Sequence, residues 1–359
     1  MSPQYFTPGP TMHYPKLYEF LEDAKRDHIF SISHRSPAFH DIFRASQENL
    51  KKLLNIPEDF HIFFLGSATE AMERLIENCV EKTSVHFVNG AFSKRMYDCA
   101  VELQKEPVIY TASLGEGFHF PSYDLPENTE LITMSHCETS GCVMAPLEEI
   151  YALKAKYPNA LIALDIVTTA PYAEIDFSKI DSVFFSIQKG FGLPAGMGVL
   201  VINEKCLEKS RKLQSKGLSI GTYHNFPNLA HYEALFSTPE TPNILGIYLL
   251  GKVASDMLSN LPSIRKDIKI KADLMYTFLD HSPVLHSLVQ NKTWRSDTVF
   301  GIATPWGSSH LMEYAKSHNF IVGSGYGEDK DKLIRIANFP MHSVSATKEL
   351  INVLRDFSI

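Results

Sequence analysis

Residues 161–190 restrict the fold of this chain more than any other stretch, because they contain two short apolar segments that are each followed by polar side chains. The first segment, residues 161–164, is entirely apolar and delivers Asp165 at its C-terminal end. The second, residues 182–185, is rich in β-branched and aromatic side chains and is followed by Lys189. Runs of this kind are typical of strands buried in a parallel sheet. Such strands place Asp165 and Lys189 side by side at one edge of the sheet, where open α/β sheets bind ligands.

An acid and a lysine in this arrangement suit pyridoxal phosphate. The lysine can bind the cofactor covalently, and the carboxylate keeps the pyridine nitrogen protonated, so that the ring accepts electrons. The alternative is that Asp165 caps a loop and that Lys189 is a solvated surface lysine. Because these two residues alone do not decide between the two interpretations, the rest of the chain has to be considered.

Composition and charge exclude several classes of protein. The 359 residues are enough for one large and one small domain, and 44% apolar with 21% charged residues is typical of a globular protein. The net charge of −7 and the lack of a basic run argue against a general nucleic-acid binder. The N-terminus has no apolar signal core and no apolar run approaches the length of a membrane span, so we expect a cytoplasmic protein.

The cysteines support neither a disulfide framework nor a metal site. The chain has five of them, an odd number with irregular spacing. His136, Cys137 and Cys142 lie close in sequence, but no second pair of ligands follows at a useful distance. We therefore expect no bound metal.

A turn of small residues connects the strand predicted at residues 61–65 to a helix. Apolar side chains recur with a period of about 3.6 residues over residues 68–80, and Ser67 with Glu70 forms a capping box at the start of this helix. Free backbone N–H groups and the helix dipole make such a turn an anion site, into which a phosphate fits. The alternative is an ordinary strand-to-helix turn, which is common.

Strands and helices continue to alternate up to about residue 202. Further strands are predicted at residues 85–88, 131–135 and 198–202. This alternation predicts an α/β domain with a parallel sheet. Four side chains follow predicted strand ends and would gather at one edge of the sheet: Phe92, Thr139, Asp165 and Lys189. Their convergence favours a ligand site at that edge.

The pattern changes after residue 236. Residues 237–242 interrupt the chain with two prolines, and two helices are predicted at residues 244–261 and 264–279, separated by Pro262. The strands and helices that follow predict a smaller α+β domain, which an extended N-terminal arm joins. The predicted domains are residues 16–243, and residues 1–15 together with residues 244–359.

Arg335 lies in the middle of a predicted strand, among the apolar residues Leu333, Ile334 and Ile336. A buried charge is costly when it has no partner. A substrate carboxylate is one candidate for this partner, and a structural aspartate or glutamate is the alternative.

Nine short features occur along nearly the whole chain: FTPGP at residues 6–10, SHRS at 33–36, GSAT at 66–69, NGAF at 89–92, ETSG at 138–141, Asp165, SIQK at 186–189, STP at 237–239 and Arg335. Each is weak alone, but their order and spacing resemble those of the class V aminotransferases, pyridoxal-phosphate enzymes of fold type I. The resemblance implies an α/β large domain with a mostly parallel, seven-stranded sheet flanked by helices, and a smaller α+β domain. It also implies a transaminase that moves an amino group between a small amino acid and a 2-oxo acid.

The resemblance implies roles for individual residues. Lys189 matches the Schiff-base lysine, and Asp165 matches the partner of the pyridine nitrogen. Phe92 matches the ring that stacks on the cofactor, and Thr139 the residue beside its phenolic oxygen. Arg335 matches the arginine that binds the substrate α-carboxylate through two parallel hydrogen bonds. The implied phosphate ligands are Ser67, Ala68 and Gln188, with Ser237 and Thr238 reaching the phosphate of the other subunit of a homodimer.

One branch of this family, the phosphoserine branch, is favoured by residues 54–57 and 236–242. In that branch His34, Arg35 and His318 would help to bind the substrate phosphate. The resemblance then implies phosphoserine:2-oxoglutarate transamination, a step of serine biosynthesis.

A second branch, that of the alanine–glyoxylate and serine–pyruvate aminotransferases, stays open. Three features look more like this branch: the TPGPT start, the HRSP motif and residues 323–330. This branch also has a His-Arg pair at the position of His34 and Arg35, so these two residues do not distinguish the branches. Asn319 also stands where the phosphoserine branch has an arginine.

Two other classes of protein fit less well. Desulfurases of this fold place a nucleophilic cysteine in the C-terminal part, whereas the last cysteine here is Cys206. A non-catalytic binding protein would not need both Asp165 and Lys189, which are present.

Overall fold

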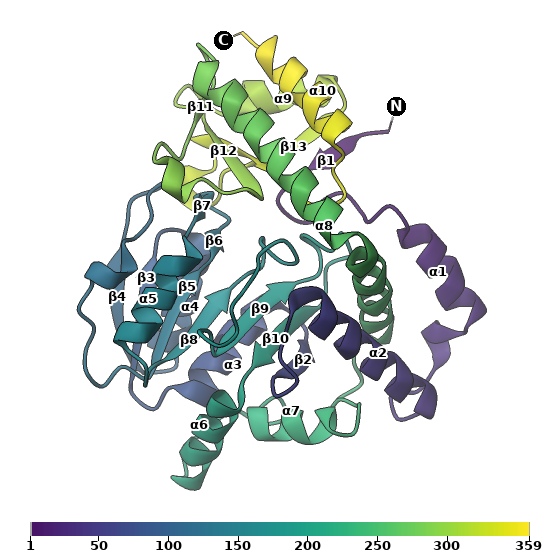
Figure 1. Ribbon diagram of the computed structural model, residues 1–359, viewed down its shortest axis with the longest axis vertical. Helices are drawn as coiled ribbons and strands as arrows, with labels where there is room; N and C mark the ends of the chain where they lie inside the picture. Colours follow the sequence, from purple (N-terminus) through teal and green to yellow (C-terminus); the bar gives the residue numbers. More distant parts are fainter. Residues whose placement is uncertain (1, 359) are drawn as a thin grey trace.

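A seven-stranded sheet forms the centre of the computed structural model, which describes residues 2–358 (Figure 1). In spatial order its strands are β2 (His61–Leu65), β10 (Gly198–Ile202), β9 (Ser182–Ser186), β8 (Leu161–Asp165), β5 (Leu131–Ser135), β3 (Thr83–Val88) and β4 (Glu106–Thr111). All neighbours run parallel except β10, which is antiparallel to both β2 and β9. The predicted α/β fold with a mostly parallel sheet is confirmed.

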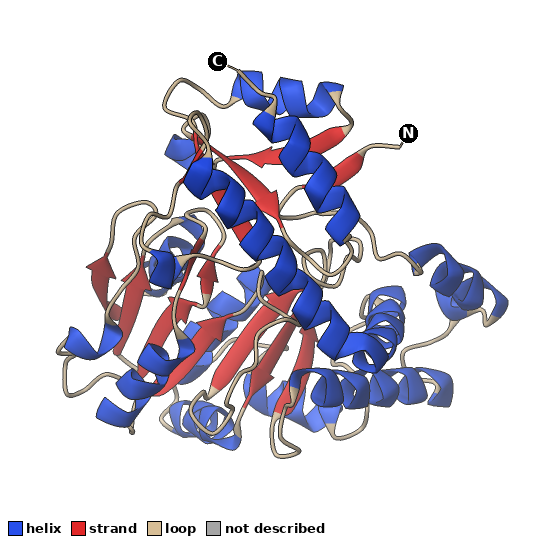
Figure 2. Ribbon diagram, turned by 45° about the horizontal axis from the view of Figure 1, so that its top comes forward, coloured by secondary structure: helices blue, strands red, loops and turns tan. Residues whose placement is uncertain are grey.

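Helices cover both faces of this sheet, as Figure 2 shows. Alternate residues of a strand point to opposite faces, so that Phe64 and Phe185 pack in one apolar core while Phe63 and Phe184 pack in the other. The first core includes α1 (Leu17–Arg26), α2 (Pro37–Leu54), α5 (Leu147–Lys156) and the first half of α8 (Ile244–His281). The second includes α3 (Ala68–Cys79), α4 (Ala91–Glu102), α6 (Glu204–Ser215) and α7 (Phe226–Glu233). Burial on both faces explains why the central strands are apolar almost throughout.

A second sheet contains five strands from the two ends of the chain. In spatial order they are β1 (Gln4–Phe6), β13 (Phe320–Ser324), β14 (Leu333–Ala337), β12 (Val299–Ala303) and β11 (His286–Ser287). The second half of α8 packs against this sheet in an apolar core of its own, together with α9 (Ser309–Ser317) and α10 (Val344–Arg355). Because β1 pairs in parallel with β13, the N-terminal arm is a strand of this sheet. The exact domain boundaries at residues 15 and 243 stay predictions.

The remaining elements are short. They are the hairpin of β6 (Cys137–Glu138) with β7 (Val143–Met144), and the 3₁₀ turns η1 (Ile29–Ser31), η2 (Phe120–Ser122), η3 (Lys292–Trp294) and η4 (Gly327–Asp329). The sequence did not predict these turns, nor did it predict β4, α6 or α7.

The prediction of two helices separated by Pro262 is wrong, because α8 continues through this proline as one helix of 38 residues. Proline inside a helix removes one backbone hydrogen bond and bends the helix, and Figure 1 shows the two halves of α8 running in different directions. Met257 is buried in the core of the large sheet and Ala272 in that of the small sheet. Burial at both ends stabilises the helix across the break.

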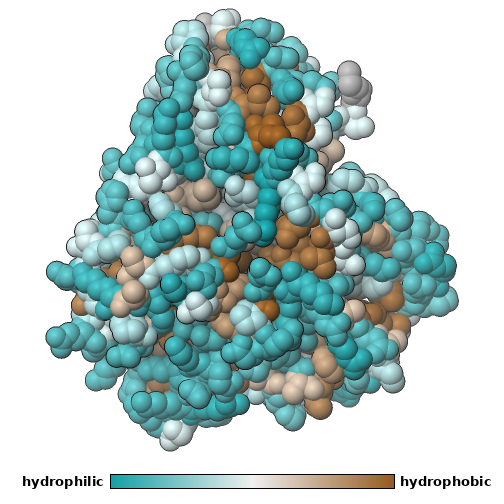
Figure 3. Space-filling model, in the orientation of Figure 1, coloured by the Kyte–Doolittle hydropathy of each residue, from teal (hydrophilic) through white to brown (hydrophobic). Residues whose placement is uncertain are grey.

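Hydrophilic side chains dominate the face of the molecule that Figure 3 shows, and the most prominent brown patch near its top lies where α8 and α10 meet. Within residues 2–358, no helix is long and apolar enough to cross a membrane.

Candidate active site

Asp165 lies at the carboxyl edge of the large sheet, where its strand β8 pairs in parallel with β9. The side chain is buried, and its Oδ1 accepts a hydrogen bond of 2.8 Å from the backbone N–H of Val167. Burial raises the pKa of Asp165 to about 7, and the nearby Glu138 adds to the effect while Lys189 opposes it. A cation beside this carboxylate would favour its charged form.

Lys189 follows β9 and is buried at the same edge of the sheet, with 8% of its surface exposed. Its Nζ donates a hydrogen bond of 2.6 Å to the carbonyl oxygen of Pro8 and lies 5.9 Å from the ring centroid of Phe92. Burial and the charge of Arg335 lower the pKa of Lys189 to about 8, against the opposing effect of Asp165. An amine with this pKa can hold or release a proton near neutral pH.

The N-terminal arm reaches Lys189 directly, which the sequence did not indicate. Gly9 has a φ of +124°, and a Cβ atom added there would lie 2.5 Å from Lys189 Nζ. Only glycine therefore fits at this position. The arm thus connects the small sheet, through β1, to the lysine of the large sheet.

Gly9→Ala is expected to lower turnover roughly 10- to 100-fold, because the new methyl group would displace either the arm or Lys189. The measurement is kcat beside the thermal unfolding temperature. Gly217→Ala is the matched control, since Gly217 also has a positive φ of +77° but its Cβ would meet no atom of residues 2–358 within 4 Å. Equal losses in both variants would show that backbone strain alone is responsible.

Arg335 projects from the middle of β14 and is buried. Its Nε donates to the carbonyl of Ser324 at 2.7 Å, and its Nη1 donates to the carbonyl of Thr139 at 3.2 Å. Carbonyl groups rather than carboxylates accept its hydrogen bonds in the part of the chain that the structure describes. Burial lowers the pKa of Arg335. The guanidinium charge is therefore available for a carboxylate ligand, and the alternative of a structural acid receives no support.

Glu138 is a buried acid beside the predicted site residues, and the sequence alone gave it no role. Its buried carboxylate accepts hydrogen bonds from the backbone N–H and the hydroxyl of Ser93, at 2.8 and 2.7 Å, and from the hydroxyl of Ser140 at 2.6 Å. These contacts hold the N-terminus of α4, whose second residue is Phe92. An acid placed directly before Thr139 at a strand end was the available signal.

The turn at residues 66–69 leads into the N-terminus of α3, a position at which anions can bind. Ser67 is the N-cap of α3, and its Oγ accepts a hydrogen bond of 3.0 Å from the N–H of Glu70. The N–H of Ala68 donates to the hydroxyl of Ser186 at 3.3 Å, which ties this turn to the end of β9. Gln188 carries a buried Oε1 atom without a hydrogen-bond partner among residues 2–358. Such a group is open to a ligand.

Pyridoxal phosphate fits these residues. Asp165 offers a buried carboxylate, Lys189 a buried amine and Phe92 an aromatic ring at one sheet edge. The turn after β2 offers backbone donors at a helix N-terminus for the phosphate. Thr139 is buried in the same region and hydrogen-bonds through its hydroxyl to Thr168 at 3.2 Å.

Ser237 and Thr238 lie next to the loop of His34 and Arg35. The hydroxyl of Ser237 donates to the carbonyl of His34 at 3.4 Å, whereas Arg35 is exposed. The loop of His34 and Arg35, which the resemblance connects with the substrate phosphate, therefore lies beside Ser237 and Thr238, which the resemblance connects with the second subunit.

The structure does not place His318 beside Arg335. It follows α9, and its Nδ1 hydrogen-bonds to the carbonyl of Tyr314 at 2.9 Å. Within β13, Gly323 lies opposite Arg335, while His318 precedes the first strand residue, Phe320. Phe320 and Gly323 are roughly 10 Å apart along the strand.

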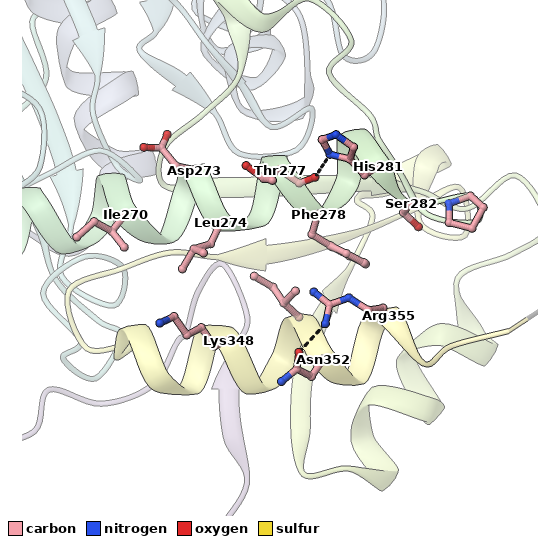
Figure 4. Close-up of a pocket in the computed structure, with 12 residues that line it drawn as sticks. Ile270, Asp273, Leu274, Thr277, Phe278, His281, Ser282, Lys348, Asn352 and Arg355 are labelled. Carbon is pink, nitrogen blue, oxygen red and sulfur yellow. Dashed lines mark hydrogen bonds between the residues drawn. The ribbon is translucent and has the colours of Figure 1, made fainter.

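A cavity lies elsewhere, between α8 and α10. Its volume is about 880 Å³, and Figure 4 shows Leu274 and Phe278 of α8 facing α10, with Lys348 and Arg355 on the opposite side. It contains none of the predicted site residues. Among residues 2–358, no three histidine, cysteine, aspartate or glutamate side chains are placed to hold a metal ion, and all five cysteines are free thiols.

Comparisons with known proteins agree with this geometry. Residues 7–325 match the family model of the class-V aminotransferases. A crystal structure of a phosphoserine aminotransferase from Cytophaga hutchinsonii is 42% identical, with a TM-score of 0.96 over 99% of this chain and 98% of that one. A phosphoserine aminotransferase of Lactococcus lactis is 27% identical over 95% of this chain and 94% of its own.

The fold is shared more widely. An alanine–glyoxylate aminotransferase from Nostoc sp. has a TM-score of 0.83 at 21% identity and covers 99% of this chain and 95% of that one. Since the family model covers most of the sequence and the Cytophaga protein is similar over nearly its whole length, this chain belongs to the class-V aminotransferases, which are pyridoxal-phosphate-dependent enzymes.

Proposed function

We propose that this protein transfers the amino group of phosphoserine to 2-oxoglutarate, with pyridoxal phosphate bound at Lys189. The observation that carries the proposal is the pair of buried side chains, Asp165 and Lys189, at the carboxyl ends of β8 and β9. The similarity to the Cytophaga protein, at 42% identity over 99% of the chain, supports the choice of phosphoserine.

Bound pyridoxal phosphate would supply an electron sink for the negative charge that develops at the substrate Cα. Lys189 Nζ would move the proton at that carbon, a task that suits an amine with a pKa of about 8. Asp165 would accept a hydrogen bond from the pyridine nitrogen and balance its positive charge. Arg335 would orient the substrate through its α-carboxylate. Burial of all three side chains excludes water and strengthens these interactions.

We further propose a cytoplasmic homodimer in which Ser237 and Thr238 complete the phosphate site of the partner subunit. The support is their position beside the His34–Arg35 loop, because one neighbouring subunit would then contribute both motifs to a site.

A half-reaction screen tests the proposed substrate. Phosphoserine, serine and alanine are added separately to the cofactor-loaded enzyme without a 2-oxo acid, and the absorbance of the bound cofactor is followed. We expect phosphoserine to convert the cofactor fastest. If serine or alanine reacts as fast, the enzyme has the activity of the alanine–glyoxylate and serine–pyruvate branch, which the presence of Asn319 keeps as the alternative.

Arg35→Ala is expected to raise the Michaelis constant for phosphoserine roughly 10- to 100-fold, because the loss of one charge-assisted hydrogen bond to phosphate costs about 1.5–3 kcal/mol. The constant for serine or alanine should change little. His318→Ala separates the two proposed phosphate ligands, since the structure places His318 at the far end of β13. If His318→Ala raises the Michaelis constant for phosphoserine more than Arg35→Ala does, the proposal that Arg35 is the main phosphate ligand is contradicted.

A further inference from the structure

His224 lies between two carboxylates beside the carboxyl end of β2. Its Nδ1 hydrogen-bonds to Glu70 Oε1, and its Nε2 hydrogen-bonds to Glu240 Oε2 at 2.8 Å. The imidazole is 5% exposed. Burial disfavours its charged form, but the hydrogen bonds to Glu240 and Glu70 outweigh this effect and raise the pKa of His224 to about 9. At neutral pH both ring nitrogens therefore donate hydrogen bonds.

The two carboxylates belong to the two segments that resemblance connects with phosphate. Glu70 lies in the first turn of α3, and its Oε2 accepts the N–H of Gly66 at 2.8 Å, so it fixes the turn that contains Ser67. Glu240 follows Thr238, whose hydroxyl donates to the Glu240 carbonyl at 2.8 Å. A cavity of about 230 Å³ is lined by Gly66, Glu70, His224 and Glu240. One histidine thus connects both segments.

We propose that Glu70, His224 and Glu240 form a clamp that positions the Ser67 turn for the cofactor phosphate of its own subunit and the Ser237–Thr238 segment for the cofactor phosphate of the partner subunit. This inference rests on the proposed function, because it takes both segments as phosphate ligands. None of the three side chains needs to touch the phosphate. They are positioning residues that act through the backbone of Gly66 and the hydroxyl of Thr238.

The clamp predicts a specific pH dependence. The charged and titratable groups that face His224 are Glu70, Glu240 and Tyr223, whose ring is tilted by 40° with its centroid 4.0 Å from that of the imidazole. Arg74 acts on Glu70. Because the pKa of His224 is raised from 6.5 to about 9, the clamp is intact at neutral pH and is lost as the pH rises through about 9. Phosphate affinity should fall over the same range.

The test compares two ligands of the cofactor-free full-length enzyme, pyridoxal phosphate and pyridoxal, in absorbance or fluorescence titrations. Pyridoxal lacks the phosphate group. The affinity for pyridoxal phosphate divided by the affinity for pyridoxal therefore reports on binding of the phosphate alone, because the protonation of Lys189 affects both ligands equally. We expect His224→Gln to lower this ratio roughly tenfold at pH 7.5, equivalent to about 1.4 kcal/mol. The ratio should fall between pH 8 and 10 in the wild type and stay level in the variant.

His61 provides a matched control. It lies at the opposite end of β2 and is also placed between two carboxylates, Glu233 at 2.5 Å and Glu204 at 3.4 Å. His61→Gln should lower thermal stability but leave the affinity ratio and its pH profile unchanged. Glu240→Gln, which keeps the volume of the side chain, replaces His224→Gln if that variant does not fold.

Three results would overturn the clamp: a ratio unchanged in both His224→Gln and Glu240→Gln, an equal loss in His61→Gln, or a wild-type ratio that does not depend on pH. A wild-type enzyme that does not prefer pyridoxal phosphate over pyridoxal would overturn the clamp together with the assigned phosphate site. If the ratio behaves as expected but phosphoserine does not convert the cofactor fastest in the half-reaction screen, the clamp is supported and the proposed substrate is wrong.

Discussion

Lys189→Ala is expected to reduce transamination by at least about 10⁴-fold while the protein still folds and binds its cofactor weakly. The substitution removes both the covalent link and the amine that would move the Cα proton, and positioned general bases alone contribute about 10²–10⁴-fold. The measurement is kcat with phosphoserine and 2-oxoglutarate, beside an absorbance titration with pyridoxal phosphate. Turnover above a trace would contradict the role of Lys189.

Lys271→Ala is the matched control for this variant. Lys271 is also buried, its pKa is lowered to about 8 by burial, and its Nζ donates to the carbonyls of Phe339 and His342 at 3.0 and 2.7 Å. It lies in the second half of α8, outside the active site. Its loss should destabilise the fold by roughly 1–3 kcal/mol and leave kcat within about threefold of wild type. The comparison separates loss of a buried amine from loss of the reacting one.

Asp165→Asn is expected to lower kcat roughly 10³-fold and to change cofactor affinity far less. Asparagine keeps the shape and can still form a hydrogen bond, but it cannot balance a positive charge on the pyridine nitrogen. The lost interaction is strongest where charge develops on the ring, so the effect belongs to the chemical step. Single-turnover rates and the dissociation constant of pyridoxal phosphate measure the two quantities separately.

Asp181→Asn serves as control because Asp181 is a buried carboxylate just before β9, at the other end of the same strand. It pairs with Lys154 at 2.6 Å and accepts the N–H of Ile162 at 2.8 Å. Its loss should lower thermal stability without a large change in the single-turnover rate. Near-normal turnover of Asp165→Asn would show that another acid serves the ring nitrogen.

The sequence by itself determined the large sheet and its candidate ligand edge. Strand positions such as 61–65 and 131–135 were correct to the residue, because strands buried on both faces are largely apolar and stand out between turns. Asp165 and Lys189 could be paired because the ends of neighbouring parallel strands must lie side by side. These inferences use only local pattern and the geometry of a parallel sheet.

The edge strand β4 and the surface helices α6 and α7 were harder to predict. Four of the five residues of the edge strand β2 are buried, whereas β4 has no buried residue, so the apolar pattern of β4 is weak. Helix α6 is rich in charged residues, and only four of its side chains are buried. The continuity of α8 through Pro262 was also hidden, because tertiary packing outweighs the local preference of proline to end a helix.

Only the tertiary structure decided which distant residues meet. Gly9 and Pro8 contact Lys189 across about 180 positions of sequence, and Glu240 meets Glu70 through His224. The same applies to His318, which the structure leaves apart from Arg335 although both lie near β13. Such contacts depend on how whole helices and strands pack, so they cannot be predicted from the local periodicity of the sequence. The sequence therefore determined which reactive side chains lie at the edge of the sheet, whereas tertiary packing decided which other residues hold them in position.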